Sequence, residues 1–377
     1  MDTATLENRW FQPDYTALRA QFVRLAQNAG GCLERHGIEA AGPGGEPLAI
    51  DVARIGPDDA RKVLVVASGT HGVEGPAGSA IQAQVLGEDL SVLHLPKDAA
   101  VVLIHAVNPF GFAWQRRQNE NNVDLNRNFL DWSRPPPERP VYAELDGLLN
   151  PLQISSDEDQ RFNVEATRLL KAHGLPWLQA RVSEGQYAFP QGLYYGGAGP
   201  EASNLIVREV LDRHLARAAE GVLIDLHTGM GAFGDWIALS ASPAGTEPHA
   251  WLQQALPPAR LSAPIGGAQA QDKRWPAVSG GLKEAAVRDN GHCDLRAFTL
   301  EFGTYDEART IRAERLENWA HHWGDRESEA GRAAVAEHAE CFAPASPIWR
   351  ARLLAGGRAA LYDVWRGLFG AEGFSPS

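Results

Sequence analysis

Two short runs of apolar residues constrain the fold of this chain more than any other feature. Residues 63–68 read VLVVAS and residues 101–106 read VVLIHA. Runs that are apolar at almost every position suit strands covered on both faces, as in the centre of a parallel sheet. Residues 76–90, between them, begin with a proline, which suits the first turn of a helix. A strand, a helix and a strand in this order predict a right-handed crossover and a largely parallel sheet.

The rest of the chain extends this pattern. Residues 48–55 alternate between apolar and polar positions like a half-exposed strand. Later runs predict further strands at 222–227, 235–240 and 297–302, and residues 201–220 predict a helix. We therefore predict an α/β fold with three layers, α/β/α, around a mixed, mostly parallel central sheet.

Two regions depart from the pattern. Residues 131–200 open with a proline run and close with a glycine-rich run, and they contain one good helix candidate at about 159–173. This region is small for an independent core, so we interpret it as an insertion. Residues 306–377 are rich in alanine and arginine with helical spacing. We predict a single domain over residues 1–377, with an insertion at about 131–200 and a helical C-terminal region at about 306–377.

Composition narrows the class of protein. The 377 residues carry a net charge of −12, whereas nucleic acids and anionic membranes attract proteins with a basic face. The three cysteines are far apart and suggest neither a disulfide framework nor a cysteine zinc site. No apolar run approaches the length of a membrane span, and the N-terminal residues do not resemble a signal peptide. We expect a cytoplasmic protein without nucleic acid or membrane partners; the oligomeric state stays open.

Chemistry-bearing residues lie at the ends of three of the predicted strands. His71 and Glu74 lie in SGTHGVE, His227 lies in LHTG, and Glu301 lies in LEFG. Binding sites of open α/β sheets collect at the carboxyl ends of strands. Two histidines and one carboxylate form a known catalytic zinc set, because three protein ligands leave a fourth position open. A further glutamate that is not a ligand can move protons.

Each of these signals has an ordinary alternative. With twelve histidines, roughly one His-x-x-Glu pair is expected by chance from average residue usage, and His36 and Glu39 form a second pair without a glycine-rich turn before it. A buried histidine such as His227 is more often satisfied by a backbone carbonyl than by a metal. Glu301 in so apolar a strand needs either a proton-transfer function or a salt bridge to an arginine.

A fourth stretch supplies positive charge. Arg116 and Arg117 follow the second apolar run, and VDLNRNF follows them at 123–129. One arginine beside a metal could polarise a carbonyl and stabilise an oxyanion. Another could bind a substrate carboxylate through two parallel hydrogen bonds. The alternative is a solvated loop of arginine and asparagine.

Taken in order, these motifs resemble those of the zinc carboxypeptidase superfamily of the M14 type, and within it the bacterial DUF2817 branch. The motifs are the His-x-x-Glu pair, the NPxG sequence at 108–111, the arginines, VDLNRNF, LHTG and LEFG. The resemblance covers about residues 45–325. It implies a Zn²⁺ ion held by three ligands, a glutamate acting as general base and acid, and an arginine that stabilises the oxyanion. The implied residues are His71, Glu74 and His227 for the metal, Glu301 for the base, and Arg117 or Arg116 for the oxyanion.

The resemblance also implies the surroundings of the metal. Asn126 and Arg127 would bind the terminal carboxylate of the substrate, and Asp124 would hydrogen-bond the ring of His71. Digestive carboxypeptidases carry a mobile tyrosine shortly before the catalytic glutamate, but residues 280–300 contain no tyrosine. Tyr194 and Tyr195 in the glycine-rich run are possible substitutes.

The implied function is a zinc-dependent hydrolase that cleaves an amide or peptide bond in a small substrate with a free carboxylate, such as a small peptide or an N-acyl amino acid. The alternative is an N-acyl amino acid deacylase of the aspartoacylase and succinylglutamate desuccinylase type, which shares the zinc set but carries a β-rich C-terminal domain. A relative that only binds zinc or a peptide is a third possibility, and the presence of Glu301 argues against it.

Overall fold

The computed structural model describes residues 8–90, 94–262 and 280–370. Within them, eight strands form one sheet in the order β1-β2-β4-β3-β5-β8-β6-β7. The strands are β1 (Cys32–Ala41), β2 (Pro47–Ile55), β3 (Lys62–Ser68), β4 (Ala99–His105), β5 (Glu220–Gly229), β6 (Trp236–Ser240), β7 (Leu261–Ser262) and β8 (Asp294–Gly303). Parallel pairing joins β4, β3, β5 and β8 at the centre. Antiparallel pairing adds β2 and β1 on one side and β6 on the other.

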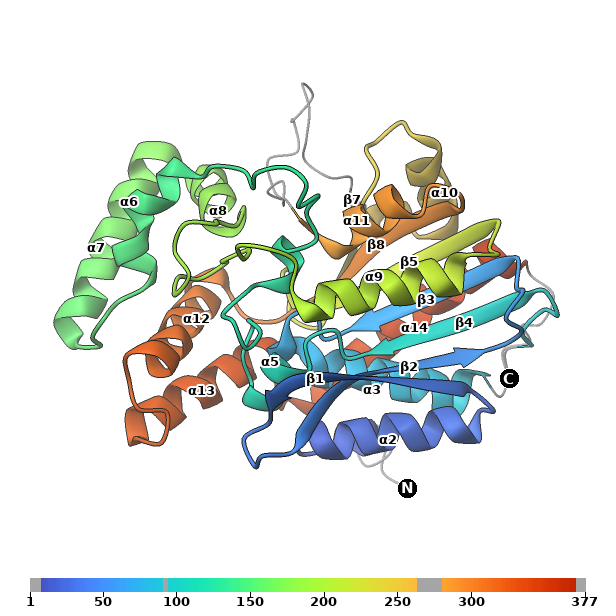
Figure 1. The fold of residues 1–377 in the computed structure, drawn as a ribbon. Helices are drawn as coiled ribbons and strands as arrows, with labels where there is room; N and C mark the ends of the chain where they lie inside the picture. The colour runs from blue at the N-terminus through green and yellow to red at the C-terminus, as the bar shows by residue number, and fades with distance from the viewer. Residues whose placement is uncertain (1–7, 91–93, 263–279, 371–377) are drawn as a thin grey trace.

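Helices cover both faces of this sheet, as Figure 1 shows with α9 in front and α3 and α14 behind. On one side the central strands pack against helices α2 (Tyr15–Asn28), α3 (Gly75–Gln84) and α14 (Pro347–Phe369). On the other side they pack against α9 (Ala202–Leu215) and α11 (Leu282–Asp289). The predicted three-layer α/β/α fold with a mixed, mostly parallel sheet is therefore confirmed.

The predicted insertion holds three helices where the sequence suggested one. They are α6 (Pro140–Leu149), α7 (Ser156–His173) and α8 (Leu175–Ser183). These helices enclose a small apolar cluster of their own that includes Tyr142, Leu145 and Tyr194, and Ile311 of the C-terminal region packs against it. The insertion therefore packs against α12 (Glu307–His322), which follows β8.

Helices occupy the described part of the C-terminal region, with α12 (Glu307–His322) and α13 (Glu329–Phe342) preceding α14. Figure 1 places α12 and α13 beside the insertion, at the end of the sheet where the central strands terminate. Trp349, at the start of α14, is fully buried and donates a hydrogen bond from Nε1 to the Gly303 carbonyl at 2.9 Å. This bond fixes α14 to the last residue of β8.

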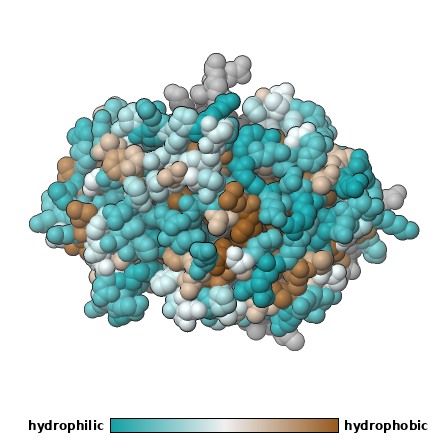
Figure 2. All heavy atoms as spheres, viewed as in Figure 1, coloured by the Kyte–Doolittle hydropathy of each residue, from teal (hydrophilic) through white to brown (hydrophobic). Residues whose placement is uncertain are grey.

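The shorter elements complete the chain. They are α5 (Pro109–Trp114), α10 (Glu247–Ala255), the 3-10 helices η1 (Asn8–Trp10), η2 (Gly72–Glu74), η4 (Leu125–Arg127) and η5 (Pro258–Arg260), and the π-helical turn η3 (Val85–Asp89). No helix among the described residues is both long enough and apolar enough to span a membrane. Figure 2 shows a mainly hydrophilic face with smaller hydrophobic areas, so the apolar runs of the sequence lie largely inside the molecule.

The turn after β3 depends on two glycines. Gly69 has a φ of +65°, which disfavours residues with a side chain. A Cβ on Gly72 would lie 2.0 Å from the carbonyl carbon of Gly111 in α5, where no side chain fits. The backbone that carries His71 is therefore pressed directly against α5.

We expect Gly72→Ala to destabilise the protein by at least about 2 kcal/mol, because the added methyl group collides with backbone atoms that cannot move independently. Gly147→Ala is the matched control, since Gly147 lies in α6 with no atom within 4 Å of an added Cβ. There the same change should stabilise by about 0.5–1 kcal/mol through helix propensity. Thermal and urea unfolding measure both variants, and equal effects would contradict the packing described for Gly72.

Candidate metal centre and its surroundings

The parallel pairing of β3, β5 and β8 brings the predicted site residues to one edge of the sheet. Ser68 at the end of β3 pairs with Leu226 of β5, and His227 pairs with Glu301 of β8. Partners in a parallel ladder point to the same face of the sheet about 4.8 Å apart. Residues that are 74 positions apart in the sequence are therefore neighbours because their strands run side by side.

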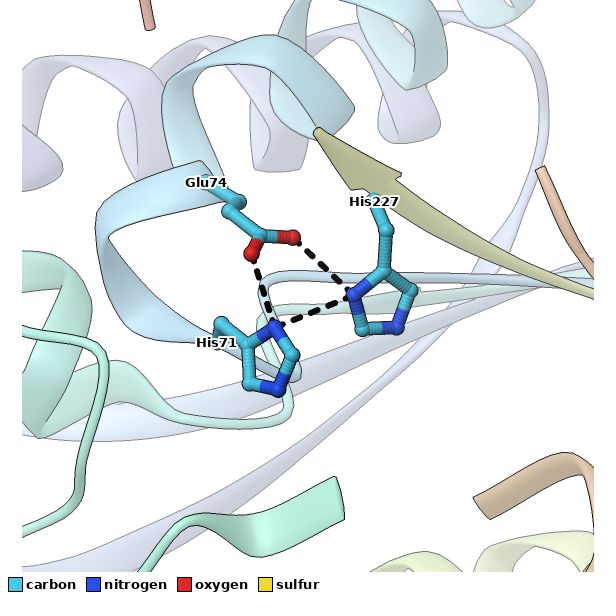
Figure 3. Close-up of side chains that lie close together, drawn as sticks. All are labelled: His71, Glu74 and His227. Atoms are coloured by element: carbon cyan, nitrogen blue, oxygen red, sulfur yellow. Dashed lines mark hydrogen bonds and ion pairs between the residues drawn. The ribbon is translucent and has the colours of Figure 1, made fainter. Parts of the chain in front are cut away.

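Three side chains meet at this edge with their acceptor atoms almost in contact (Figure 3). The Nδ1 atom of His71 lies 2.7 Å from Oε1 of Glu74 and 3.1 Å from Nδ1 of His227. Nδ1 of His227 lies 3.0 Å from Oε2 of Glu74. All three side chains are at least 95% buried. The predicted metal ligands are thus brought together.

Two aspartates fix the orientation of the histidine rings. Nε2 of His71 lies 3.2 Å from Oδ1 of Asp124, and Nε2 of His227 lies 2.7 Å from Oδ2 of Asp225. A carboxylate beside Nε2 keeps the proton on that nitrogen, so each Nδ1 presents a lone pair. The hydroxyl of Thr70 in turn donates to Asp225 at 2.8 Å. Asp124 therefore has the position that the sequence resemblance implies.

This arrangement requires a positive charge between the three side chains. Two lone pairs and a carboxylate repel one another in a buried place unless a proton or a cation lies among them. Burial lowers the pKa of His227, but Asp225 and Glu74 more than offset this and hold the pKa well above its ordinary value. Two imidazole nitrogens and one carboxylate are donors that zinc accepts readily, so the residues fit that ion.

Glu301 lies beside the three candidate ligands. Its Oε1 accepts a hydrogen bond from the Met230 backbone N–H at 3.1 Å. Among the described residues no arginine or lysine pairs with it, so the alternative of a structural salt bridge finds no support there. Burial raises the pKa of Glu301 to about 7, and the Glu74 carboxylate adds to the increase. A carboxyl group with such a pKa can both accept and release a proton near neutral pH.

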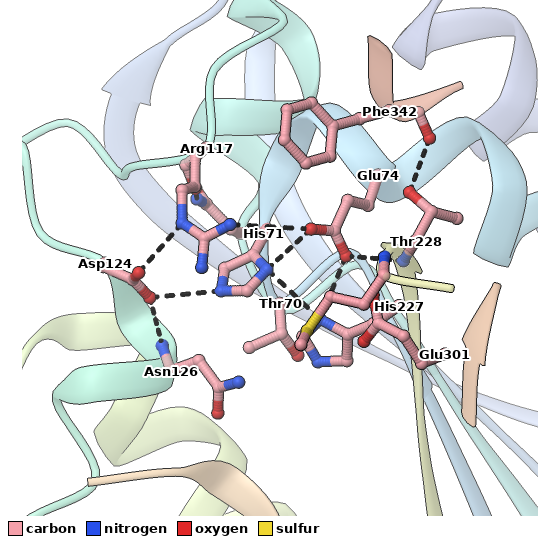
Figure 4. A network of polar contacts seen from close by, with 12 residues as sticks. Thr70, His71, Glu74, Arg117, Asp124, Asn126, His227, Thr228, Glu301 and Phe342 are labelled. Carbon is pink, nitrogen blue, oxygen red and sulfur yellow. Dashed lines mark hydrogen bonds and ion pairs between the residues drawn. The ribbon is translucent and has the colours of Figure 1, made fainter. Parts of the chain in front are cut away.

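The side chains of the two consecutive arginines lie in different environments. Arg117 lies beside the candidate metal ligands, with Nη1 3.9 Å from Oε1 of Glu74 and Nε donating to Asp124 at 3.0 Å (Figure 4). Arg116 is fully buried and points instead into α12, where Nε donates to Glu317 at 3.0 Å. Arg117 is therefore the arginine near the candidate metal ligands, whereas the guanidinium of Arg116 pairs with Glu317 away from them.

Asn126 and Arg127 lie on η4, directly after Asp124. The backbone N–H of Asn126 donates to Asp124, and its side-chain Oδ1 accepts from the Leu282 N–H at 3.1 Å. The Nδ2 group of Asn126 has no hydrogen bond within the described part of the chain and is available to a ligand. Nη1 of Arg127 lies 3.9 Å from Asp124, and its side chain is almost fully buried.

The two tyrosines have different environments. The Tyr194 hydroxyl donates to Glu314 of α12, and the Arg117 guanidinium carbon lies 5.1 Å from the centre of its ring. Burial and the nearby Glu314 carboxylate raise the pKa of Tyr194 well above its ordinary value, so the hydroxyl stays protonated. The Tyr195 side chain packs instead in the apolar core with residues of η4 and α9. Tyr194 therefore joins the polar network around the site, whereas Tyr195 does not.

Sequence reasoning missed the carboxylates of α12. Glu314 and Glu317 are both buried, and each receives one of the paired arginines. A signal was present in the sequence, because residues 307–322 are helical in spacing but carry charged residues on every side. A helix without an apolar face that nevertheless packs inside a protein must bury some of its charges against partners.

The second His-x-x-Glu pair does not form a metal site. His36 and Glu39 lie within strand β1, where residues three apart point to opposite faces. Nε2 of His36 lies 3.2 Å from Glu34 on the same strand. The prediction that this pair arose by chance is consistent with its place in the structure.

The purified protein should bind about one divalent metal ion per chain, and His227→Ala should lose it, because only two ligands would remain. His36→Ala is the matched control and should keep the metal. Elemental mass spectrometry after dialysis against excess zinc and then metal-free buffer measures the content of all three proteins. Equal metal content in wild type and His227→Ala would place the metal elsewhere.

Comparisons by sequence and by structure relate this chain to known proteins. A search of curated proteins finds no match. Among solved structures, the chain is similar to a candidate metallopeptidase from Shewanella amazonensis SB2B, with 15% identity, a TM-score of 0.47 and coverage of 95% of this chain and 94% of that one. It is also similar to carboxypeptidase A from Helicoverpa armigera, with 14% identity, a TM-score of 0.47 and coverage of 89% and 80%.

A metallo-carboxypeptidase from Pseudomonas aeruginosa is a third similar structure, with 15% identity, a TM-score of 0.42 and coverage of 92% of this chain and 68% of that one. The family model described as a protein of unknown function, DUF2817, matches residues 11–356, which is most of the chain. That span contains every candidate site residue, and the chain belongs to the DUF2817 family.

Proposed function

We propose that this protein is a zinc-dependent hydrolase that cleaves an amide or peptide bond in a small substrate with a free carboxylate. The observation that carries the proposal is the buried group of His71, Glu74 and His227 with Glu301 beside it. A site that only stored a metal would need the three ligands. It would have no need of an additional buried carboxyl group that lacks an ion pair among the described residues and has a pKa near 7.

The candidate roles follow from where each side chain lies. A zinc ion at the three ligands would act as a Lewis acid towards water and the substrate carbonyl. Glu301 accepts a proton from the water molecule whose oxygen attacks the carbonyl carbon. It then delivers that proton to the amide nitrogen as the carbon–nitrogen bond breaks. Arg117 donates hydrogen bonds to the carbonyl oxygen as negative charge develops on it.

The substrate carboxylate is assigned to η4. The Nδ2 group of Asn126 is available to donate a hydrogen bond, and Arg127 adds positive charge on the next residue. A small peptide or an N-acyl amino acid presents a carboxylate close to the amide bond that is cleaved. The net charge of −12 disfavours nucleic acid and anionic membranes as partners.

The deacylase alternative differs in the part of the chain after the site. That type of enzyme carries a β-rich C-terminal domain, whereas residues 307–369 here form three helices. Dipeptides and N-acyl amino acids with the same C-terminal residue, tested with the zinc-loaded protein, separate the two functions. We expect faster hydrolysis of the dipeptides, and hydrolysis confined to acyl amino acids would favour the alternative.

Glu301→Gln should keep the metal and lose at least about 10²-fold in kcat, the usual scale for a general base, because an amide cannot accept the proton. Glu329→Gln is the matched control, since Glu329 is exposed at the start of α13 and should leave kcat unchanged. Steady-state kinetics with metal analysis of each variant tests this. Turnover of Glu301→Gln near the wild-type rate would remove Glu301 from the mechanism.

The pH dependence should report the same residue. Glu301 must be ionised to accept a proton, so kcat/KM should rise with pH and level off above the pKa of this group. Burial raises that pKa to about 7, and the charge of a bound metal lowers it, so the acid limb is expected at or below about pH 7. A kcat/KM that falls as pH rises from about 5 to 7, with metal content constant, would contradict this role.

A further inference from the structure

Arg117 is held from three directions by groups that lie outside the candidate metal ligands. Its Nε donates to Oδ2 of Asp124 at 3.0 Å, and its Nη1 donates to Oε1 of Glu314 at 3.3 Å. The ring of Tyr194 lies against the guanidinium, 5.1 Å from its carbon to the ring centre. Nη2 has no hydrogen bond within the described residues, so it remains available to a substrate oxygen.

Glu314 and Tyr194 form a connected pair. One carboxylate oxygen of Glu314 accepts from Arg117 and the other accepts from the Tyr194 hydroxyl. Both residues are at least 95% buried, so each contact occurs in a region of low dielectric, where charge-assisted hydrogen bonds are strong. Glu314 therefore fixes the side of Arg117 that faces away from Asp124.

The backbone at Tyr194 supports a specific role for this tyrosine. Tyr194 has a φ of +58°, a left-handed conformation that is unfavourable for a bulky aromatic residue. Its carbonyl accepts from the Gln186 N–H at 3.0 Å, which holds the loop in place. Strained conformations of this kind persist where the surrounding structure requires a side chain in a particular position. Here the strain brings the Tyr194 ring and hydroxyl to Arg117 and Glu314.

Helix α12 also provides a different carboxylate partner for each of the two consecutive arginines. Glu314 and Glu317 are three residues apart and so lie on one face of the helix. Glu314 receives Arg117, and Glu317 receives Arg116 through hydrogen bonds of 3.0 and 3.2 Å. Because Arg116 is bound in this way, only Arg117 is left beside Glu74.

We infer that Glu314 and Tyr194 are positioning residues that hold the Arg117 guanidinium beside the candidate metal centre. The inference rests on the proposed function, because the position of Arg117 affects a rate only if the site hydrolyses a substrate. Tyr194 of the insertion and Glu314 of α12 would thus act on the site through Arg117, since neither has a hydrogen bond or ion pair to a candidate metal ligand within the described residues.

The kinetic test uses Glu314→Gln and Tyr194→Phe, each in the wild-type and in the Arg117→Ala background. In the wild-type background we expect kcat to fall roughly 10- to 100-fold with little change in KM, the scale of a misplaced catalytic group. In the Arg117→Ala background the same substitutions should change kcat less than about threefold, because they act through Arg117. An equal loss in both backgrounds would overturn the inference.

Glu317→Gln is the matched control on the same face of α12. It should lower the melting temperature by breaking the buried pair with Arg116, and leave kcat close to that of the wild type. If Glu314→Gln does not fold, Tyr194→Phe still carries the test, because it removes one hydroxyl group and keeps the ring. A loss of kcat in Glu317→Gln as large as in Glu314→Gln would show that α12 acts only through general stability and would overturn the inference.

Crystal structures of the zinc-loaded wild type, Glu314→Gln and Tyr194→Phe provide a measurement independent of activity. We expect the guanidinium of Arg117 to leave its place beside Glu74 in the variants. An unmoved guanidinium in both would overturn the inference, whatever the kinetics. If the wild type hydrolyses none of the substrates tested, the proposed function fails, and these structures alone decide whether Glu314 and Tyr194 position Arg117.

Discussion

Repulsion among three acceptor atoms at a buried point is the constraint on which the rest of the site depends. The Nδ1 atoms of His71 and His227 lie 3.1 Å apart, and the carboxylate of Glu74 lies within 3.0 Å of both. With Asp124 and Asp225 at the other ring nitrogens, both histidines present lone pairs to this point. Such a cluster is stable only around positive charge, supplied by a proton or a cation, and its two imidazole nitrogens and one carboxylate fit a zinc ion.

Around that point, negatively and positively charged side chains alternate along a series of contacts that leads away from the histidines. Asp124 contacts His71 and, on its other side, Arg117. Arg117 in turn donates a hydrogen bond to Glu314, which also accepts a hydrogen bond from the Tyr194 hydroxyl. Every buried charge in this series of contacts has a partner of opposite sign or a hydrogen-bond donor, as burial requires. Glu301 is the exception, since it has one backbone hydrogen bond and no cationic partner among the described residues. That exception supports its assignment to proton transfer.

The sequence predicted the sheet and the convergence of the site because both follow from local patterns. Apolar runs mark β3, β4, β5 and β8, and parallel strands must end at a common edge, so His71, His227 and Glu301 could be expected to meet. Strand β1 was missed because its sequence, CLERHGIEAA, is polar at many positions, as suits an edge strand that is only partly buried. Helices α6 and α8 were missed because proline- and glycine-rich segments flank them and conceal their short apolar faces.

The parts that sequence did not predict depend on contacts between distant residues. The choice between Arg116 and Arg117 is made by Glu317 and Glu314, about 200 positions further along the chain. The difference between Tyr194 and Tyr195 follows from the left-handed backbone at Tyr194, which turns one ring towards Arg117 and the other into the core. Neither outcome follows from residue type or spacing. Both depend on contacts with α12, whose position relative to the site the local sequence does not specify.

Anomalous X-ray diffraction at the zinc absorption edge, from crystals grown with zinc, tests the central claim most directly. We expect one strong peak between the three side chains, about 2.0–2.2 Å from Nδ1 of His71, Nδ1 of His227 and a carboxylate oxygen of Glu74. Glu301 should stay outside the coordination sphere. A peak bound by other residues, or no peak at this edge of the sheet, would contradict the account and remove the basis for a metal-dependent hydrolase.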